Sequence, residues 1–363
     1  MAVTQSGPPV AGGGQPGTDT ACPGHEPMPE GDEVAAYAPF DAGPFGVGTR
    51  SFEAADPARN RAFPIQVWHP ARAGDSAGTG SLPLVVFAHG SGGNRRSAAY
   101  LCAHLASHGY AVAAMDHSEV VAAELVSGPD ESAPERAARI YAVIAGRVPD
   151  VRFLLDVLLS EGAAGTGGGA AGLDLDLDPG RVGLVGHSFG GWTALAVPET
   201  DDRVRAVVAL GPGGSSRPRP GILPLTLTFA WGRDVPTLYL AAEDDVPIPL
   251  EAVSELFDRT PGTRRMFVLR RADHQHFLDD VAGVHEALRA MSLPGDAAWL
   301  PAAMRPISEL CSGEQAHLFV RGLTLAHLDA ALRQSAAAER FLAGDVVAGM
   351  AARGVAALAP EGC

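Results

Sequence analysis

The sequence Gly-His-Ser-Phe-Gly-Gly places Ser188 in a setting that suits nucleophilic chemistry. The apolar run 182–185 before it reads as a strand, and residues 192–197 after it read as a helix. A serine between strand and helix in a G-x-S-x-G pattern is typical of a nucleophile elbow. Gly186 and Gly190 supply the tiny residues that this turn requires, because strand and helix almost touch there. The pattern predicts acyl transfer through a covalent serine ester, with the helix N-terminus favouring the developing anion.

A serine hydroxyl is a weak nucleophile, so it needs a base, and the base needs an acid that orients it. In this arrangement the chain order is serine, acid, histidine, with each residue following a strand. After the apolar run 236–242, the acid position offers Glu243, Asp244 and Asp245. We choose Asp245, because a proline that can start a helix follows it after a short turn. Asp244 is interpreted as a turn or cap residue and Glu243 as a solvated flank, and both stay open as alternatives.

Two histidines follow the last predicted strand, residues 266–269. His274 comes first, in a tight turn, and is the candidate base, whereas His276 is interpreted as a packed or hydrogen-bonded neighbour. A rival interpretation takes the pair as metal ligands. No further cluster with clear ligand spacing accompanies them, so we expect no metal.

The oxyanion of an acyl-transfer reaction needs hydrogen-bond donors. One is the backbone N–H of Phe189, directly after the serine, and the second should come from the loop after an earlier strand. That loop, residues 89–93, reads His-Gly-Ser-Gly-Gly, and its glycines let the backbone approach a substrate closely. We expect the N–H of Ser91 to be the second donor, with His89 bracing the loop. An ordinary glycine-rich turn or a phosphate cradle is the alternative, but a phosphate loop would call for a lysine and the chain has none.

Strand-like and helix-like segments alternate from about residue 46, which predicts an α/β fold with a doubly wound, mostly parallel sheet. Ligands then bind at the carboxyl ends of the strands. The predicted strands are 50–55, 63–68, 82–88, 110–115, 182–186, 204–210, 236–242 and 266–269. Helical insertions are expected at about 117–148 and 211–234, and a helical C-terminal part at about 280–350.

The domain organisation follows from composition. Residues 1–34 are rich in Gly, Pro and Ala without periodicity, which predicts a disordered tail. Residues 163–172 are nearly all Gly and Ala, which predicts a flexible surface loop. We expect one globular domain from about residue 35 to 350.

Composition excludes several classes of function. The chain has 363 residues, a net charge of −15 and no lysine, so nucleic acid is an unsuitable partner and Schiff-base chemistry is excluded. No apolar run approaches the roughly 18 residues that span a bilayer. The four cysteines, which are widely spaced, are interpreted as free thiols of a cytoplasmic protein: Cys22, Cys102, Cys311 and Cys363. No cofactor is expected, and a homodimer is left open.

The chain resembles the platelet-activating-factor acetylhydrolase and dienelactone-hydrolase-like branch of the α/β-hydrolase superfamily. The matching segments are 83–93, 105–117, 150–156, 182–195 and 272–277, within a resemblance that covers about residues 43 to 280. The resemblance implies an α/β-hydrolase fold with Ser188 as nucleophile, His274 as base, and Ser91 and Phe189 as oxyanion donors.

One position departs from the acetylhydrolase pattern. Some acetylhydrolases carry their acid after the strand 204–210, where this chain reads Gly-Pro-Gly-Gly at 211–214. Bacterial relatives, including cutinase-like polyesterases, place the acid after the next strand, which suits Asp245. The resemblance therefore implies the triad but leaves a phospholipid substrate open.

These observations predict a serine carboxylic-ester hydrolase that acts on a small-molecule ester, with a small to medium apolar acyl group. Residues 222–231 and the insertion at 117–148 could form a lid and an acyl pocket, or could simply pack on the sheet. The alternatives are a thioesterase, lactonase, amidase or acyltransferase that uses the same triad, or a non-catalytic ligand binder.

Overall fold

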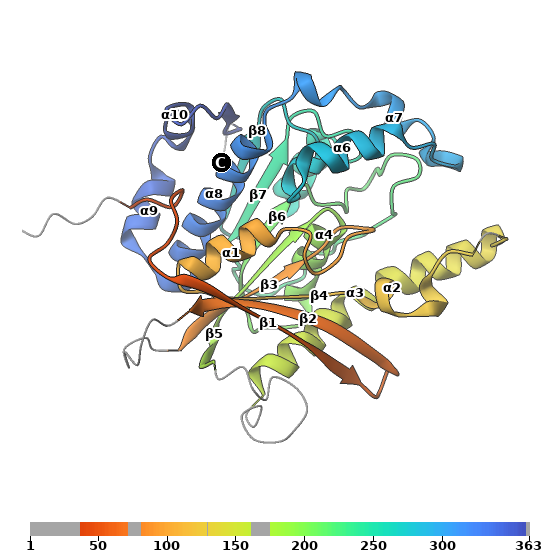
Figure 1. Ribbon diagram of the computed structural model, residues 1–363, viewed down its shortest axis with the longest axis horizontal. Helices are drawn as coiled ribbons and strands as arrows, with labels where there is room; N and C mark the ends of the chain where they lie inside the picture. The colour runs from red at the N-terminus through yellow and green to blue at the C-terminus, as the bar shows by residue number, and fades with distance from the viewer. Residues whose placement is uncertain (1–36, 72–80, 129, 161–174, 361–363) are drawn as a thin grey trace, which may run out of the picture. The chain divides into compact units, whose positions relative to one another are not determined.

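The computed structural model describes residues 37–71, 81–128, 130–160 and 175–360 (Figure 1). All of them belong to one compact unit that begins at Tyr37. The expectations for the tail 1–34, for the loop 163–172 and for Cys22 and Cys363 fall outside the described residues.

The described residues form a single mixed sheet of nine strands in the order β1-β2-β4-β3-β5-β6-β7-β8-β9. The strands are β1 (Gly46–Asp56), β2 (Arg61–Ala71), β3 (Leu82–Ala88), β4 (Ala111–Met115), β5 (Leu177–His187), β6 (Val204–Leu210), β7 (Thr237–Ala242), β8 (Arg264–Leu269) and β9 (Ala357–Leu358). The six strands from β4 to β8 in this order run parallel, whereas β1, β2 and β9 join antiparallel at the two edges. The predicted doubly wound, mostly parallel sheet is confirmed.

Helices cover both faces of this sheet. They are α1 (Ala99–Ser107), α2 (Ser118–Val121), α3 (Ala133–Leu159), α4 (Phe189–Ala196), α5 (Leu250–Arg259), α6 (Val281–Ala290), α7 (Leu300–Ala303), α8 (Gly313–Arg333), α9 (Ala336–Ala343) and α10 (Val346–Ala351). Helices α1 and α8 share one core with one face of the central strands, and α3, α4 and α5 share a second core with the other face (Figure 1). Every residue of β4 and of β7 is buried, as expected for parallel strands that are covered on both sides.

The segment 211–234 contains no helix, so the prediction of a helical insertion there is wrong. Its apolar residues alternate with exposed ones, and Leu225, Leu227, Phe229 and Trp231 are buried. A period of two belongs to an extended chain, because successive side chains then point to opposite sides. The buried side chains pack against α4, and the Trp231 indole donates a hydrogen bond of 3.1 Å to the Leu195 carbonyl. This run therefore packs on the core.

Helix α3 begins at a capping box, in which Ser132 and Glu135 each accept a hydrogen bond from the other's backbone N–H. It continues without a break through Pro149 to Leu159, so it extends well past the expected insertion at 117–148. Its buried positions include two charged residues, Arg147 and Asp150, beside its aliphatic ones. A helix with charges on its buried face must find partners for them inside the protein.

The C-terminal part after residue 280 is helical up to α10, and the strand β9 then follows beyond the expected boundary near 350. This strand pairs with Val268 and Leu269 at the end of β8, directly before the turn that carries His274. The C-terminal part therefore supports the candidate site from the edge of the sheet.

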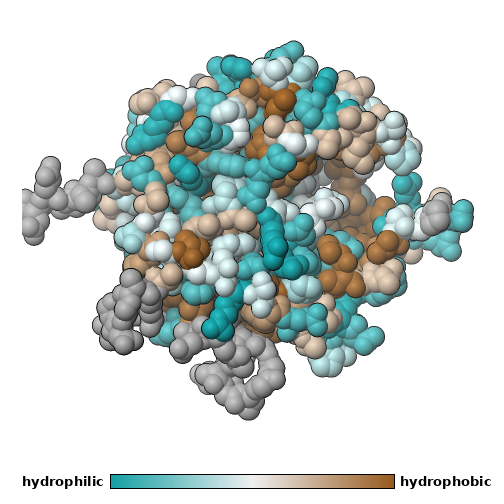
Figure 2. All heavy atoms as spheres, viewed as in Figure 1, coloured by the Kyte–Doolittle hydropathy of each residue, from teal (hydrophilic) through white to brown (hydrophobic). Residues whose placement is uncertain are grey.

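On the face shown in Figure 2, hydrophilic and hydrophobic residues are interspersed. Within the described ranges, no helix has the length and apolar character to cross a membrane.

Candidate active site

Ser188 lies at the carboxyl end of β5 and caps the N-terminus of α4, with φ 59° and ψ −116°. A positive φ in a non-glycine residue is strained backbone, which is the mark of a nucleophile elbow. A Cβ atom on Gly186 would overlap the carbonyl of Gly190, and a Cβ on Gly190 would overlap the carbonyl of Ala88. Both glycines are therefore required by the close approach of strand and helix.

The structure brings His274 and Asp245 together. His274 begins a short 3-10 helix (His274–Phe277) after β8, and its Nδ1 lies 2.7 Å from Oδ2 of Asp245. The other oxygen of Asp245 accepts a hydrogen bond of 2.7 Å from the N–H of Ile248, at the turn that leads into α5. Both side chains are buried, at 5% exposure for Asp245 and 6% for His274.

The two competing acids have other partners. Glu243 accepts hydrogen bonds from the Arg271 N–H and from the Arg270 side chain. It therefore connects the acid loop after β7 to the histidine loop after β8. Asp244 forms an ion pair with Arg305 at 3.2 Å. Asp245 is thus the member of the three that reaches the imidazole.

The electrostatics of the pair favour a basic imidazole. Burial opposes protonation of His274, but the charge of Asp245 and its hydrogen bond outweigh burial and hold the pKa of His274 above its ordinary value. The carboxylate also fixes Nδ1 as the protonated nitrogen, which leaves Nε2 as the basic one.

Ser188 and His274 line one open pocket of about 370 Å³. Its other walls are the glycine-rich loop 90–94, residues 278–280 and Val284 of α6. No hydrogen bond joins the two catalytic candidates in the described structure; such bonds are often long without substrate and tighten when it binds.

The two expected oxyanion donors face the same region. Phe189 is the first residue of α4, so its N–H has no partner within the helix. Ser91 lies in the glycine-rich turn that is closed by a 3.1 Å hydrogen bond from the Gly93 N–H to the Gly90 carbonyl. A Cβ on Gly90 would lie 3.2 Å from the Ser188 Cβ, which shows how closely this loop approaches the serine.

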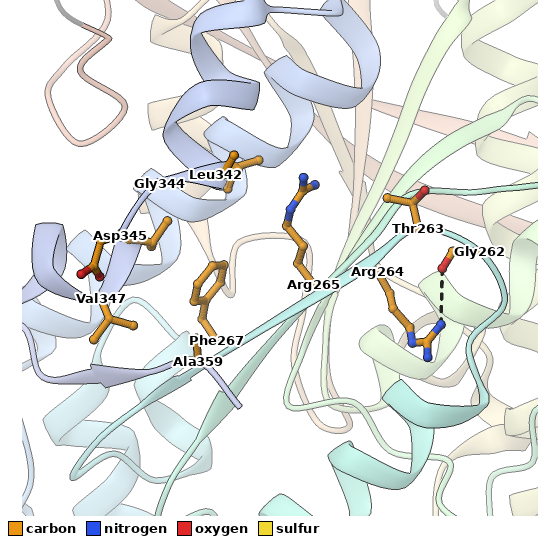
Figure 3. A pocket seen from close by; sticks show the side chains of 12 residues that line it. Gly262, Thr263, Arg264, Arg265, Phe267, Leu342, Gly344, Asp345, Val347 and Ala359 are labelled. Carbon is orange, nitrogen blue, oxygen red and sulfur yellow. Dashed lines mark hydrogen bonds between the residues drawn. The ribbon is translucent and has the colours of Figure 1, made fainter. Parts of the chain in front are cut away.

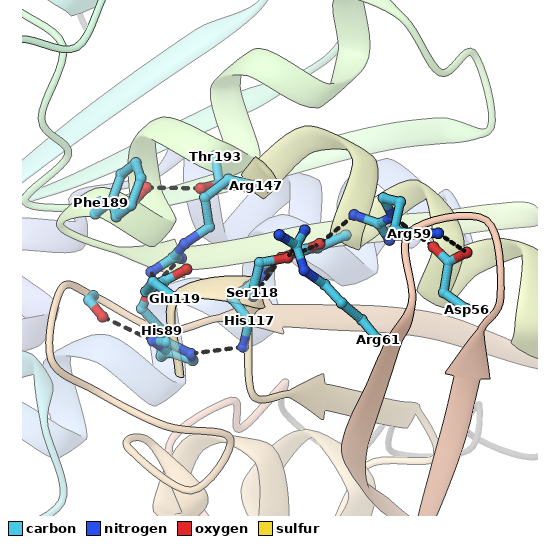
Figure 4. Close-up of polar contacts among 12 residues, drawn as sticks. Asp56, Arg59, Arg61, His89, His117, Ser118, Glu119, Arg147, Phe189 and Thr193 are labelled. Carbon is cyan, nitrogen blue, oxygen red and sulfur yellow. Dashed lines mark hydrogen bonds and ion pairs between the residues drawn. The ribbon is translucent and has the colours of Figure 1, made fainter. Parts of the chain in front are cut away.

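A buried polar network supports the oxyanion loop from behind (Figure 4). The N–H of His117 donates to Nε2 of His89, in accord with the bracing role expected for His89. Arg147 donates to the His89 carbonyl, and Asp150 accepts from the N–H and the hydroxyl of Ser118. Sequence reasoning missed Arg147 and Asp150. The sequence does carry a signal for them: Arg147 and Asp150 have opposite charges, lie three residues apart on either side of Pro149, and fall on the otherwise apolar side of the helix.

Gly211, directly after β6, faces the acid–histidine pair. It has φ 46°, and a Cβ there would lie 3.2 Å from Oδ2 of Asp245 and 3.5 Å from Nδ1 of His274. This is the position where some acetylhydrolases were expected to carry their acid. A carboxylate after β6 and one after β7 would therefore serve the same imidazole.

The rival interpretation of a metal pair finds no support in the geometry. Nδ1 of His274 is bound to Asp245, and Nε2 of His276 lies 3.1 Å from the Cys311 carbonyl oxygen. No group of three or more potential metal ligands gathers among the described residues. Cys102 and Cys311 are free thiols.

A second pocket of about 640 Å³ lies between β8 and the helices α9 and α10 (Figure 3). It is lined by residues such as Arg265, Phe267 and Leu342 and includes none of the predicted site residues. Ser91, Ser188 and His274 instead line the pocket beside the elbow.

Comparisons with known proteins agree with this fold. A family model described as "Platelet-activating factor acetylhydrolase, isoform II" matches residues 63–146. The platelet-activating factor acetylhydrolase of Cavia porcellus is 27% identical, over 54% of this chain and 48% of its own length. That of Canis lupus familiaris is 26% identical with the same coverage. The chain thus spans about half the length of the curated relatives that it matches.

A solved structure, a ferulic acid esterase from Streptomyces cinnamoneus, superposes with a TM-score of 0.57 at 25% identity, covering 83% of this chain and 93% of that one. The sheet, the elbow and this superposition show that the chain has the α/β-hydrolase fold. The chain is similar to ester-hydrolysing enzymes, among them the platelet-activating factor acetylhydrolases, and the resemblance predicted from sequence is confirmed.

Proposed function

We propose that this chain is a serine carboxylic-ester hydrolase that works through an acyl-enzyme on Ser188. The observation that carries the proposal is the buried hydrogen bond of 2.7 Å between Asp245 and His274, a histidine that lines the same pocket as a serine with a strained backbone. An acid-held histidine beside a serine in an elbow is the arrangement that activates a hydroxyl for attack on an acyl carbon.

In the proposed reaction, the Ser188 oxygen attacks the ester carbonyl and His274 Nε2 takes its proton. Asp245 stabilises the imidazolium that forms, and the N–H groups of Ser91 and Phe189 donate to the oxyanion. The alcohol leaves with the proton from His274. Water, deprotonated by His274, then attacks the acyl-enzyme and releases the carboxylic acid and the free serine.

The pocket favours small acyl groups. Its volume of about 370 Å³ is at the small end for ligand sites, and its aliphatic lining residues are Leu278 and Val284. Its lining includes neither residues 222–231 nor the insertion at 117–148, whereas residues 224–227 line a separate pocket of about 620 Å³ together with Gly214 and Glu255. An acyl pocket built by residues 222–231 stays a prediction. A series of nitrophenyl esters of increasing chain length tests this: turnover should fall beyond short acyl chains, and a flat profile would count against a size-limited pocket.

The central test replaces Ser188 with Ala. Turnover of a short-chain nitrophenyl ester should fall by several orders of magnitude, on the order of 10⁴-fold or more, with the fold retained. Labelling by a fluorophosphonate probe should disappear with it. The control is Ser127→Ala, an exposed serine whose hydroxyl bonds to Glu131, and it should keep full activity. Ester turnover that survives in S188A would refute the nucleophile.

The same machinery could serve a thioester, a lactone, an amide or an acyl acceptor other than water. Comparing kcat/KM for matched oxygen esters, thioesters, lactones and amides separates these activities. A chain that binds such compounds but neither turns them over nor reacts with the fluorophosphonate would be the non-catalytic binder.

A further inference from the structure

One buried cation contacts both halves of the candidate oxyanion hole. Arg147, from the middle of α3, is completely buried and donates a hydrogen bond of 2.7 Å from a terminal nitrogen to the carbonyl of His89. The same guanidinium lies over the ring of Phe189, 4.1 Å from its centroid (Figure 4). His89 comes two residues before Ser91, and Phe189 is itself the other candidate donor.

The surroundings of Arg147 hold it in this place. Its other terminal nitrogen forms an ion pair with Glu119 of α2, which compensates the buried charge. A guanidinium can donate in two directions within its plane and stack an aromatic ring on its face at the same time. An ammonium group offers a point charge without that plane, so lysine could not make the same three contacts.

We propose that Arg147 is a positioning residue of the oxyanion hole, a role that rests on the proposed function. By holding the His89 carbonyl and the Phe189 ring against one rigid group, it sets the spacing between the N–H groups of Ser91 and Phe189.

This role differs from a purely structural one in what its loss should change. Donors that are misplaced by a fraction of an ångström lose interaction with the oxyanion, which exists only in the transition state and the intermediate. Ground-state binding of the ester should be nearly unaffected. A residue that only stabilises the fold would change the midpoint of unfolding without this selective effect.

The test compares Arg147→Met and Arg147→Lys with the unsubstituted chain, on a short-chain nitrophenyl ester and a trifluoromethyl ketone. Such a ketone adds to the serine and forms an oxyanion, so its inhibition constant reports on the oxyanion hole. In R147M, we expect kcat and kcat/KM to fall together by about 10²-fold, KM to stay within about twofold, and the inhibition constant to rise in parallel with the loss in kcat/KM. R147K keeps the charge, so its kcat and kcat/KM should be about tenfold higher than those of R147M.

The control is Arg139→Gln, on the same helix, where Arg139 pairs with Glu131 away from the oxyanion loop. It should retain activity within about twofold. Because removal of Arg147 leaves Glu119 without its partner, the double variant Arg147→Met/Glu119→Gln provides a folded comparison if R147M does not fold. A folded Arg147 variant with unchanged kcat and ketone affinity, or with a loss confined to KM, would overturn the inference.

Failure of the proposed function is distinguishable from failure of this inference. If the unsubstituted chain shows neither ester turnover nor labelling of Ser188 by a fluorophosphonate, the proposed function is wrong. If it shows both and the folded Arg147 variants behave like it, only the role of Arg147 is wrong.

Discussion

The two sides of Ser188 are supported in different ways. On the histidine side, the loops after β7 and β8 hold each other through two hydrogen bonds: Asp273 accepts from the N–H of Val246 at 3.1 Å, and His274 Nδ1 bonds to Asp245 at 2.7 Å. On the oxyanion side, the loops after β3 and β4 are held by buried charges on α3. One side is therefore assembled by neighbouring loops of the sheet, whereas the other depends on the inserted helix α3.

A buried carboxylate ties two segments together on each side. Asp273 joins the acid loop to the histidine loop, whereas Asp150 joins the start of α2 to the β1–β2 hairpin through Ser118 and through Arg59 at 2.5 Å. Substitutions on the histidine side should therefore act mainly on the chemistry, and removal of Asp150 mainly on stability. The predictions below test that division.

Among substitutions that leave Ser188 in place, the largest effect is expected for Asp245→Asn. Loss of the carboxylate removes the group that orients the imidazole and stabilises its protonated form, so kcat/KM should fall by about 10³-fold or more. The rate of the unsubstituted chain should rise with pH through the pKa of His274, because the neutral imidazole is the base and Asp245 holds that pKa above its ordinary value. In the variant this limb should move to lower pH, since burial without the carboxylate lowers the pKa.

A pH–rate profile of kcat/KM measures both effects of D245N. Asp244→Asn is the matched control, because Asp244 is the adjacent acid and pairs with Arg305 at the surface. D244N should leave both kcat/KM and the position of its pH-dependent limb unchanged. An unmoved limb in D245N, or an equal loss in D244N, would transfer the acid role to another residue.

The second prediction concerns stability on the oxyanion side. Asp150→Ala removes the buried acceptor of the Ser118 N–H and hydroxyl and one of the two carboxylates that pair with Arg59, so the free energy of unfolding should fall by about 3 kcal/mol. Urea unfolding followed by circular dichroism measures it. Asp156→Ala on the same helix removes an exposed carboxylate that pairs with Arg203, and it should cost less than about 1 kcal/mol. Equal losses for the two variants would show that the buried network does not stabilise this side.

The smallest effect is expected for Asp273→Asn. The charge of Asp273 adds to that of Asp245 in raising the pKa of His274, so its removal should move the acidic limb to lower pH by less than about one unit. The shift should be smaller than in D245N, with a loss in kcat/KM of about tenfold or less. The same profile measures it, and a shift larger than that of D245N would make Asp273 the dominant partner of the imidazole.

Much of the fold was predictable because its strands are buried on both faces. Residues 82–88 and 204–210 were predicted to the residue, since a run of apolar residues, continuous in 82–88 and interrupted only by Arg205 in 204–210, ends where the buried strand ends. The site residues could be ordered because the elbow and the two later loops follow parallel strands, which bring them to one edge of the sheet.

The parts that were not predictable depend on tertiary partners. Arg147 and Asp150 lie on a helix whose charges would ordinarily face solvent, and only the packed structure shows the carbonyl, the ring and the loops that they contact. The segment 211–234 was predicted as helical because it contains many apolar residues. These residues alternate with polar or small ones at a period of two, which indicates an extended chain and should have decided the prediction.

Gly211 bears on the charge beside the acid–histidine pair. A side chain there would come within 3.2 Å of the Asp245 carboxylate, so a second acid would meet the first as a like charge at close range. Two carboxylates at that distance would have to share a proton, which would weaken the charge that either one offers the imidazole. With glycine at residue 211, the Asp245–His274 pair of this chain meets no such competitor after β6.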